Sequence, residues 1–316
     1  MERGVSLLAM KDVALGPIAE GTGEQSKNSA SSSLRNYISV LKLGITIANV
    51  MATIAGLWVG SHGHPDILTL VFTIIGTALV VAGGAALNNY VDRDIDDRMS
   101  RTKERAMVTG KVQPKIVLRM GLSLGIMGTV FLAVLVNVVA AACAFGGFIA
   151  YTYIYTVWLK RTTTLSTVLG GVAGALPPLI GFAAGSHGRL GLGAWVLFLM
   201  FFFWQPPHFL PLAMKRAQEY RAAGIPMLPV VRGFAETKLQ ILLYTSAMVP
   251  VSLLLYGLGY EGIAYLGVSL VLGLIFFGRA VQGLFVKDDL AWSKKLFGFS
   301  LLYLTAMCIV MIVSAV

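Results

Sequence analysis

Residues 88–101 read Asn-Asn-Tyr-Val-Asp-Arg-Asp-Ile-Asp-Asp-Arg-Met-Ser-Arg and combine amides, carboxylates and guanidinium groups. Four of the fifteen acidic residues of the chain fall within these positions, directly after the apolar run 67–87. If that run crosses a bilayer, the carboxylates lie where a membrane helix reaches its polar end. Charges at that depth are costly unless they are paired, hydrated or bound to a cation. The stretch is therefore the first candidate for a functional site.

The spacing of three polar residues in this stretch predicts a metal site. Asn88, Asp92 and Asp96 are four residues apart, so they share one face if the helix continues through them. Two carboxylates and an amide suit a hard divalent cation, above all Mg²⁺, which keeps its other positions for water and substrate phosphates. We predict that all three residues are metal ligands and catalytic, and that Asn89 on the flank contacts the substrate.

The alternative is a solvated helix end whose carboxylates pair with the neighbouring Arg93, Arg98 and Arg101. This alternative fits Asp94 and Asp97 well, because both point away from the Asn88 face. It fits Asn88 itself poorly, because that residue lies inside the apolar run.

Basic residues follow in two places that we expect at the same membrane face. The loop after the acidic stretch contains Arg101, Lys103 and Arg105, and a later helix end contains Lys160 and Arg161. Arginine binds phosphate oxygens in a bidentate manner and lysine binds them as a point charge. A metal site beside basic residues is typical of diphosphate binding. We therefore predict that Arg101, Arg105 and Lys160 are catalytic and that Lys103 and Arg161 contact the substrate. The alternatives are a topology signal or contact with anionic lipid head groups.

A third segment, 201–209, reads Phe-Phe-Phe-Trp-Gln-Pro-Pro-His-Phe. Its prolines are expected to break or kink a helix and to free carbonyl groups. Aromatic residues alone indicate a membrane-interface belt, but Gln205 and His208 at membrane depth favour a pocket for a flat aromatic or isoprenoid group. We predict that Trp204, Gln205 and His208 contact substrate. Glu219 follows on the same predicted side and is a further candidate.

The composition identifies the elements that must position these residues. The chain of 316 residues is 56% hydrophobic and only 13% charged, with a mean hydropathy of +0.76, whereas soluble domains carry about 25% charged residues. We therefore expect an all-α membrane protein. Apolar runs of about 20 residues are long enough to span a bilayer. Nine are predicted, at 38–60, 67–89, 115–136, 138–158, 164–184, 191–214, 237–258, 262–284 and 292–314.

The distribution of basic residues predicts the orientation of these helices. With a cytoplasmic N-terminus and nine helices, all but Arg189 of the 25 lysines and arginines fall on the cytoplasmic side. The net charge of +10 then reflects topology, and nucleic-acid binding is excluded. Residues 1–35 are polar and are expected to form a disordered cytoplasmic tail, followed by one nine-helix domain over 36–316.

Several motifs resemble a known family. The Asn88-x₃-Asp92-x₃-Asp96 motif followed by Met-Ser-Arg-Thr resembles the first aspartate motif of the UbiA superfamily of intramembrane prenyltransferases. Further segments resemble its protohaem IX farnesyltransferase (haem O synthase) branch. These are Leu-Lys-Arg-Thr at 159–162, Gly-Ala-Leu-Pro-Pro-Leu-Ile-Gly at 174–181, Trp-Gln-Pro-Pro-His-Phe at 204–209 and Ala-Gly-Ile-Pro-Met-Leu-Pro at 223–229. The resemblance covers about 36–314.

The resemblance implies nine transmembrane helices around a central cavity, in the cell membrane, with the active face cytoplasmic. It also implies Mg²⁺, with farnesyl diphosphate and haem B as substrates and haem O as product, which passes to haem A synthase or a terminal oxidase. Two positions depart from the family pattern. Asn89 stands where many members have Asp, and Glu219 is the single carboxylate where the superfamily has two.

Two other functions remain open from the sequence. A prenyltransferase for a quinone or chlorophyll precursor would use the same aspartate helix, and the segment around His208 discriminates against it. A non-catalytic haem or metal transporter would also place carboxylates and histidine near a membrane face. Discontinuous and internally repeated helices would favour transport, and the sequence shows no clear repeat.

Overall fold

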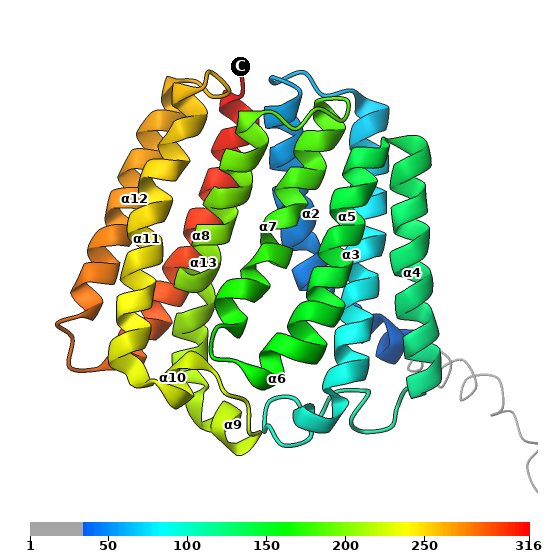
Figure 1. Ribbon diagram of the computed structural model, residues 1–316, viewed down its shortest axis with the longest axis vertical. Coiled ribbons are helices and arrows are strands. Elements are labelled where there is room, and N and C mark those ends of the chain that lie inside the picture. The colour runs from blue at the N-terminus through cyan, green and yellow to red at the C-terminus, as the bar shows by residue number, and fades with distance from the viewer. Residues whose placement is uncertain (1–33) are drawn as a thin grey trace, which may run out of the picture.

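The computed structural model describes residues 34–316, which form a bundle of helices (Figure 1). Residues 1–33, most of the predicted tail, lie outside the described part. Within 34–316, nine helical segments are long and apolar enough to span a membrane, which confirms the predicted number. They are α2 (Leu43–Gly60), α3 (Ile67–Asp96), α4 (Pro114–Leu135), the segment Val138–Thr162, α7 (Ser166–Gly185), α8 (Leu192–Lys215), α11 (Gly233–Gly257), α12 (Ile263–Gly283) and α13 (Asp289–Ser314).

The helices divide into two groups that lie side by side in Figure 1. One group contains α2, α3, α4, α7 and the segment Val138–Thr162, and the other contains α8, α11, α12 and α13. Successive helices pack on one another, and the groups meet where α7 contacts α8 and where α2 contacts α13. Helices in lipid associate mainly through close packing and hydrogen bonds, because lipid tails are as apolar as the side chains.

The closest packing joins α2 to α7. A Cβ atom at Gly56 would lie 2.0 Å from the carbonyl oxygen of Pro178, and one at Gly181 would lie 1.8 Å from that of Thr53. No side chain fits at either position, so glycine lets the two backbones touch. This contact brings α2, the first spanning helix, against the fifth.

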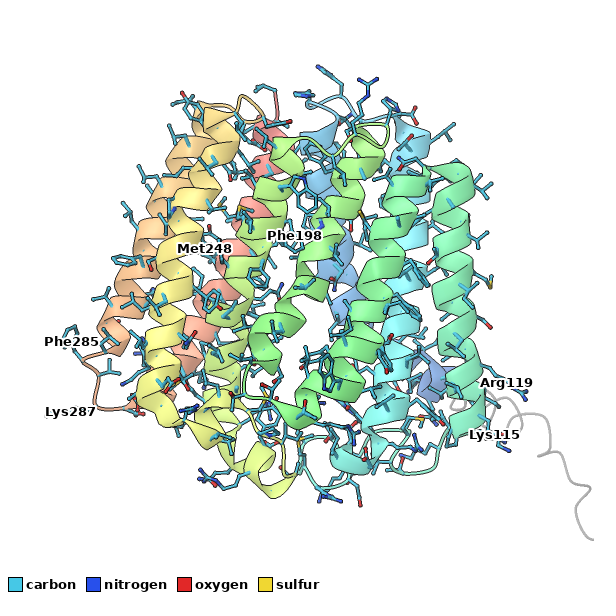
Figure 2. The ribbon with its side chains drawn as sticks, in the orientation of Figure 1. Lys115, Arg119, Phe198, Met248, Phe285 and Lys287 are labelled. Carbon is cyan, nitrogen blue, oxygen red and sulfur yellow. The ribbon has the colours of Figure 1, made fainter. Side chains whose placement is uncertain are left out.

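The two ends of the bundle differ. The basic end carries the short helices α6 (Lys160–Thr162), α9 (Ala217–Ala222) and α10 (Leu228–Val231), and Figure 2 places Lys115, Arg119 and Lys287 there. The short-loop end carries the connections 61–66, 186–191 and 258–262. The arrangement agrees with the predicted distribution of basic residues, and the orientation of the bundle in the membrane stays a prediction.

Three predicted features of the helices differ from the structure. The first spanning helix begins at Leu43 and not at 38, because residues 34–39 form a separate helical turn and Lys42 takes a left-handed conformation with φ 49°. The predicted helix 138–158 comprises α5 (Val138–Ile149), the π-helix η1 (Ala150–Leu159) and α6. Helix α8 runs unbroken through Pro206 and Pro207, so of the predicted break or kink the structure excludes the break.

Glu261 lies at the short-loop end, where the chain from α11 to α12 pairs with residues after α13. Glu261 and Ala315 form an antiparallel bridge, and the amide of Gly262 donates to the carbonyl of Ser314 at 2.9 Å. Glu261 is 2% exposed, and neither of its carboxylate oxygens has a hydrogen-bond partner among the described residues. This carboxylate is buried far from the basic end.

Candidate active site

Helix α3 continues past the apolar run as far as Asp96, so the first part of the acidic stretch is helical and lies at the basic end of the bundle. Asn88, Asp92 and Asp96 are all at least 95% buried and line one pocket, so the predicted shared face is present. The pocket has a volume of about 140 Å³. It is lined by Lys42, Asn88, Asp92, Asp96, Met99, Arg101, Arg105, Tyr151, Tyr155, Lys160 and Tyr220.

Asp92 is at the centre of the polar contacts. Its Oδ2 accepts from Lys160 Nζ at 2.6 Å and from Asn88 Nδ2 at 2.9 Å. Its Oδ1 is buried and has no hydrogen-bond partner within residues 34–316. An unpaired carboxylate oxygen in a buried site is costly unless a cation, water or donor satisfies it. One oxygen of Asp92 is therefore free to bind a metal ion while the other is held.

Asp96 is held by the loop that follows α3. Arg105 donates to its Oδ2 at 2.5 Å, and the hydroxyl of Thr102 donates to its backbone carbonyl at 2.8 Å. Thr102 is fully buried, so this bond fixes the turn after the helix. The loop 97–113 therefore folds back and returns a guanidinium group to the carboxylate from which it started.

Lys42 also belongs to the pocket, and sequence reasoning assigned it only to the topology signal. It stands at the break before α2, and its Nζ donates to Asn88 Oδ1 at 2.5 Å. Loss of hydration lowers the pKa of Lys42 to about 7, and repulsion from Arg105 adds to that effect. The predicted helix start at 38 placed Lys42 inside a regular helix. The left-handed turn that directs this side chain into the pocket was therefore not predicted.

The π-helix η1 forms the wall opposite α3. π-Helical turns are rare and occur frequently at functional sites. The hydroxyl of Thr156 donates to the Tyr151 carbonyl at 2.7 Å and accepts from Asn88 Nδ2 at 3.1 Å. Tyr151 and Tyr155 stack with their ring centroids 5.9 Å apart, and both line the pocket. No sequence pattern indicated a π-helix here, so these two tyrosines were not among the predicted site residues.

The segment after α8 closes the pocket from the second group of helices. Tyr220 of α9 is a lining residue, and burial raises the pKa of its phenol. Glu219 beside it accepts from Arg216 at 3.0 Å, whereas its Oε2 is buried and has no partner in the described chain. Glu219 is thus near the pocket rim, with one carboxylate oxygen held in an ion pair.

None of the seven predicted substrate contacts lines this pocket. Asn89 is buried, and its amide donates to the carbonyls of Val40 and Ala85, so it fastens α3 to the turn before α2. Arg161 makes two bonds to Asp94, at 2.7 and 2.8 Å. Asp94 therefore pairs with Arg161 and not, as the alternative expected, with the arginines near it in sequence. Lys103 is exposed and is not among the lining residues.

The Trp-Gln-Pro-Pro-His segment forms a second, aromatic cluster within the bundle. His208 stacks between Trp204 and Phe297, with ring centroids 4.4 and 4.8 Å away. Its Nδ1 lies 2.8 Å from Ser300 Oγ on α13. Gln205 is 5% exposed and packs against Gly174 of α7, where a Cβ atom would lie 2.6 Å from its amide nitrogen. The three residues predicted here are buried together at the contact of α7, α8 and α13.

The charges of the pocket fit a metal ion with a polyphosphate. Four basic side chains and two carboxylates line it, and because the pKa of Lys42 is about 7, the excess at neutral pH lies between one and two positive charges. Among the described residues, no group of three or more His, Cys, Asp and Glu side chains is close enough to form a metal cage by itself. Mg²⁺ is commonly held by one or two carboxylates plus substrate phosphates, and the free Asp92 Oδ1 suits that role. Asn88 Oδ1 is occupied by Lys42 in this arrangement.

Comparison with known proteins identifies the family. A model of the UbiA prenyltransferase family matches residues 49–304, so the chain belongs to this family. It is 47% identical over 286 residues to a protoheme IX farnesyltransferase of Alkalihalophilus pseudofirmus, covering 89% of this chain and 90% of that protein. It is 42% identical over 301 residues to the protoheme IX farnesyltransferase of Geobacillus kaustophilus, covering 94% and 96%.

Solved structures share the fold. The chain is similar to a digeranylgeranylglyceryl phosphate synthase structure with a TM-score of 0.76 and 20% identity, over 89% of this chain and 98% of that one. It is also similar to a UbiA homologue from Archaeoglobus fulgidus bound to DMAPP and Mg²⁺, with a TM-score of 0.64 and 16% identity, over 88% and 99%. The nine-helix architecture is therefore that of the family.

Proposed function

We propose that this membrane prenyltransferase transfers the farnesyl group of farnesyl diphosphate to a vinyl group of haem B. The reaction consumes one water and yields haem O and diphosphate. The observation that carries the proposal is the buried pocket in which Asp92 keeps one oxygen unpaired beside four cationic side chains. Haem B is proposed as the acceptor because the relatives at 42–47% identity over most of the chain are named protoheme IX farnesyltransferases.

The pocket residues act on the diphosphate. Asp92 and Asp96 would hold Mg²⁺, which neutralises a leaving diphosphate as a Lewis acid. Arg101, Arg105 and Lys160 are placed to stabilise the negative charge that grows on the diphosphate as its bond to the farnesyl carbon breaks. Lys42 is a fourth cation in the same wall and keeps Asn88 in place. Lys103 and Arg161 contribute to the positive surroundings without touching the pocket.

The aromatic cluster would receive haem B. Trp204 and Gln205 would contact the macrocycle, and His208 would bind its iron. His208 lies five residues before Ala213 on α8, about 7.5 Å along the helix axis. Ala213 belongs to the same apolar cluster as Met99, which lines the pocket. The two sites are thus close enough for one farnesyl chain to reach from the diphosphate to a haem vinyl group.

The bundle also protects the reaction. The farnesyl carbon becomes cationic as diphosphate leaves, and bulk water would capture it. The interior between the pocket and the aromatic cluster is apolar, with residues such as Ile95 and Met99 buried. Excluding water from such a site strengthens its electrostatic interactions and prevents hydrolysis of reactive species. The single water that adds after the vinyl group attacks completes the hydroxyl of the product.

The test is a reconstituted reaction. Purified full-length protein is incubated with haem B, Mg²⁺ and farnesyl diphosphate, and the haems are separated and identified by mass spectrometry. We expect a more retained haem whose mass has increased by one farnesyl group and one hydroxyl. Omission of Mg²⁺ or addition of a chelator should stop its formation. A parallel reaction with a hydroxybenzoate acceptor tests quinone-precursor prenylation, and product there but not with haem would contradict the proposal.

Haem transport is tested with the same protein in sealed vesicles. Movement of haem across the membrane without any new haem species would favour a transporter.

We further propose a cell-membrane location with the basic end cytoplasmic, where farnesyl diphosphate is soluble. Labelling of single cysteines introduced at the two ends, from either side of intact cells, tests that orientation. Haem A synthase or a terminal oxidase would then accept the product within the membrane, and cross-linking in native membranes tests that contact.

A further inference from the structure

The hydrogen bonds around His208 define which of its ring nitrogens carries the proton. The hydroxyl of Ser300 donates to the Phe297 carbonyl at 2.6 Å. A serine hydroxyl has one hydrogen, so its oxygen can only accept from the imidazole 2.8 Å away. The proton of the neutral ring is then on Nδ1, and Nε2 keeps its lone pair.

The free nitrogen of His208 remains available. Nε2 forms no hydrogen bond with the described residues, yet it is not one of the buried polar atoms sealed off from solvent. Its residue is 8% exposed, although the ring faces are covered by Trp204 and Phe297. Phe209 packs edge-on against the ring, with its centroid 4.8 Å away, so Nε2 is the one polar ring atom left without a partner among the described residues. Imidazole nitrogen in this form is a good ligand for haem iron.

Ser300 is itself fixed from both sides. It is fully buried on α13, and its backbone carbonyl accepts from Trp204 Nε1 at 3.1 Å. The tryptophan that stacks on the imidazole therefore also holds the serine that bonds to it. Rotation of the ring would break the bond to Ser300 and the two stacking contacts together.

We propose that Ser300 is the positioning residue that presents Nε2 of His208 to the iron of the haem substrate. This inference rests on the proposed function, because it takes haem B as the molecule that His208 binds. A histidine that ligates a metal usually donates its other N–H to a fixed acceptor, which sets the tautomer and raises the basicity of the ligating nitrogen. Loss of such an acceptor costs about 10- to 100-fold in metal affinity.

The test compares two serines of one helix. Ser300→Ala removes the acceptor. Ser293→Ala is the matched control, because Ser293 is also fully buried on α13 and its hydroxyl bonds only to the Leu290 carbonyl at 3.0 Å. Each full-length protein is purified in detergent and titrated with haem B. The iron–imidazole stretching vibration of the reduced complex is measured by resonance Raman, because it reports hydrogen bonding at the opposite ring nitrogen.

We expect Ser300→Ala to weaken haem B binding about 10-fold and to lower the stretching frequency, while Ser293→Ala changes neither. His208→Ala should abolish the vibration, and added imidazole should restore an iron–imidazole complex. An unchanged frequency in Ser300→Ala, or a normal vibration in His208→Ala, would overturn the inference. Haem O formation by the wild-type protein would in those cases leave the proposed function intact. Conversely, the expected spectra without any haem O would support the inference and contradict the function.

Discussion

Buried carboxylates occur at both ends of this bundle, and their surroundings differ. At the basic end, Asp92 and Asp96 are each paired with a cation, Lys160 and Arg105. At the short-loop end, Glu261 is equally buried but has no partner for either oxygen in the described chain. Burial raises the pKa of Glu261 to about 8.

The difference separates two uses of a buried acid. A carboxylate surrounded by cations stays ionised and can exchange one partner for a metal ion or gain a substrate anion nearby. A carboxylate without cations takes up a proton and becomes a neutral polar group. The depth of an acidic residue therefore does not identify a site by itself, whereas the charges around it do.

Asp92→Asn should abolish haem O formation, lowering the rate by at least about 100-fold, because it removes the negative charge that binds the metal while keeping the shape. Turnover with saturating substrates is the measurement. Asp94→Asn is the matched control, since Asp94 is two residues away, exposed, and bonded to Arg161 instead of the pocket. Near-normal turnover by Asp92→Asn would remove the metal assignment.

Lys42→Met should lower kcat/KM for farnesyl diphosphate about 10-fold. The substitution keeps the length of the side chain but removes the charge beside Asn88 and one donor in the pocket wall. Steady-state kinetics at varied farnesyl diphosphate check this, and Lys42→Arg should recover part of the loss. Equal rates for Lys42→Met and the wild type would mean that Lys42 does not act on the substrate and contributes only to the membrane topology.

Thr156→Val should reduce activity by a smaller factor, about 5-fold, because one neutral hydrogen bond contributes about 1 kcal/mol. It removes the acceptor that orients Asn88 and leaves the volume of the side chain nearly unchanged. Thr245→Val on α11 serves as the control, because Thr245 is also fully buried and bonds only to its own helix. Comparison of the two variants at equal haem and farnesyl diphosphate tests the contribution of the π-helix wall.

Glu261→Gln should leave activity unchanged and alter the pH dependence of stability. The unfolded chain releases the Glu261 proton near pH 4.5 and the folded chain near pH 8. The folded state therefore binds more protons between these values, and the free energy of unfolding falls as pH rises, by about 1 kcal/mol per unit. Thermal unfolding in detergent from pH 5 to 8 should show a falling Tm for the wild type and a flatter profile for Glu261→Gln. Identical profiles would mean that Glu261 is hydrated and ionised.

The sequence predicted the fold well, because each spanning helix needs a long apolar run and the basic residues mark the loops. It also located the acidic face of α3, since a spacing of four residues is independent of the rest of the fold. It did not predict Lys42, which depends on a left-handed turn inside an apolar run. Nor did it predict the tyrosines of η1, because a π-helix changes which residues share a face.

Contacts between side chains from distant segments could not be predicted from the sequence either. The ion pair of Arg161 with Asp94 was not predicted, and it forms because the helix end that carries Arg161 lies beside α3. Asn89 was predicted on the metal flank and instead binds the turn before α2. In both cases, the residue type was compatible with two roles, and only the packing of neighbouring helices decides between them.

The glycine contact between α2 and α7 has a consequence for the assembly of the protein in the membrane. The ribosome completes α2 at Gly60 and reaches α7 only at Ser166, after three further spanning segments have been made. Until then the face of α2 around Gly56 lacks its α7 partner. The close backbone contact at Gly56 and Gly181 can form only once α7 has been made. The pocket itself is completed later still, because Tyr220 follows α8, the sixth spanning helix.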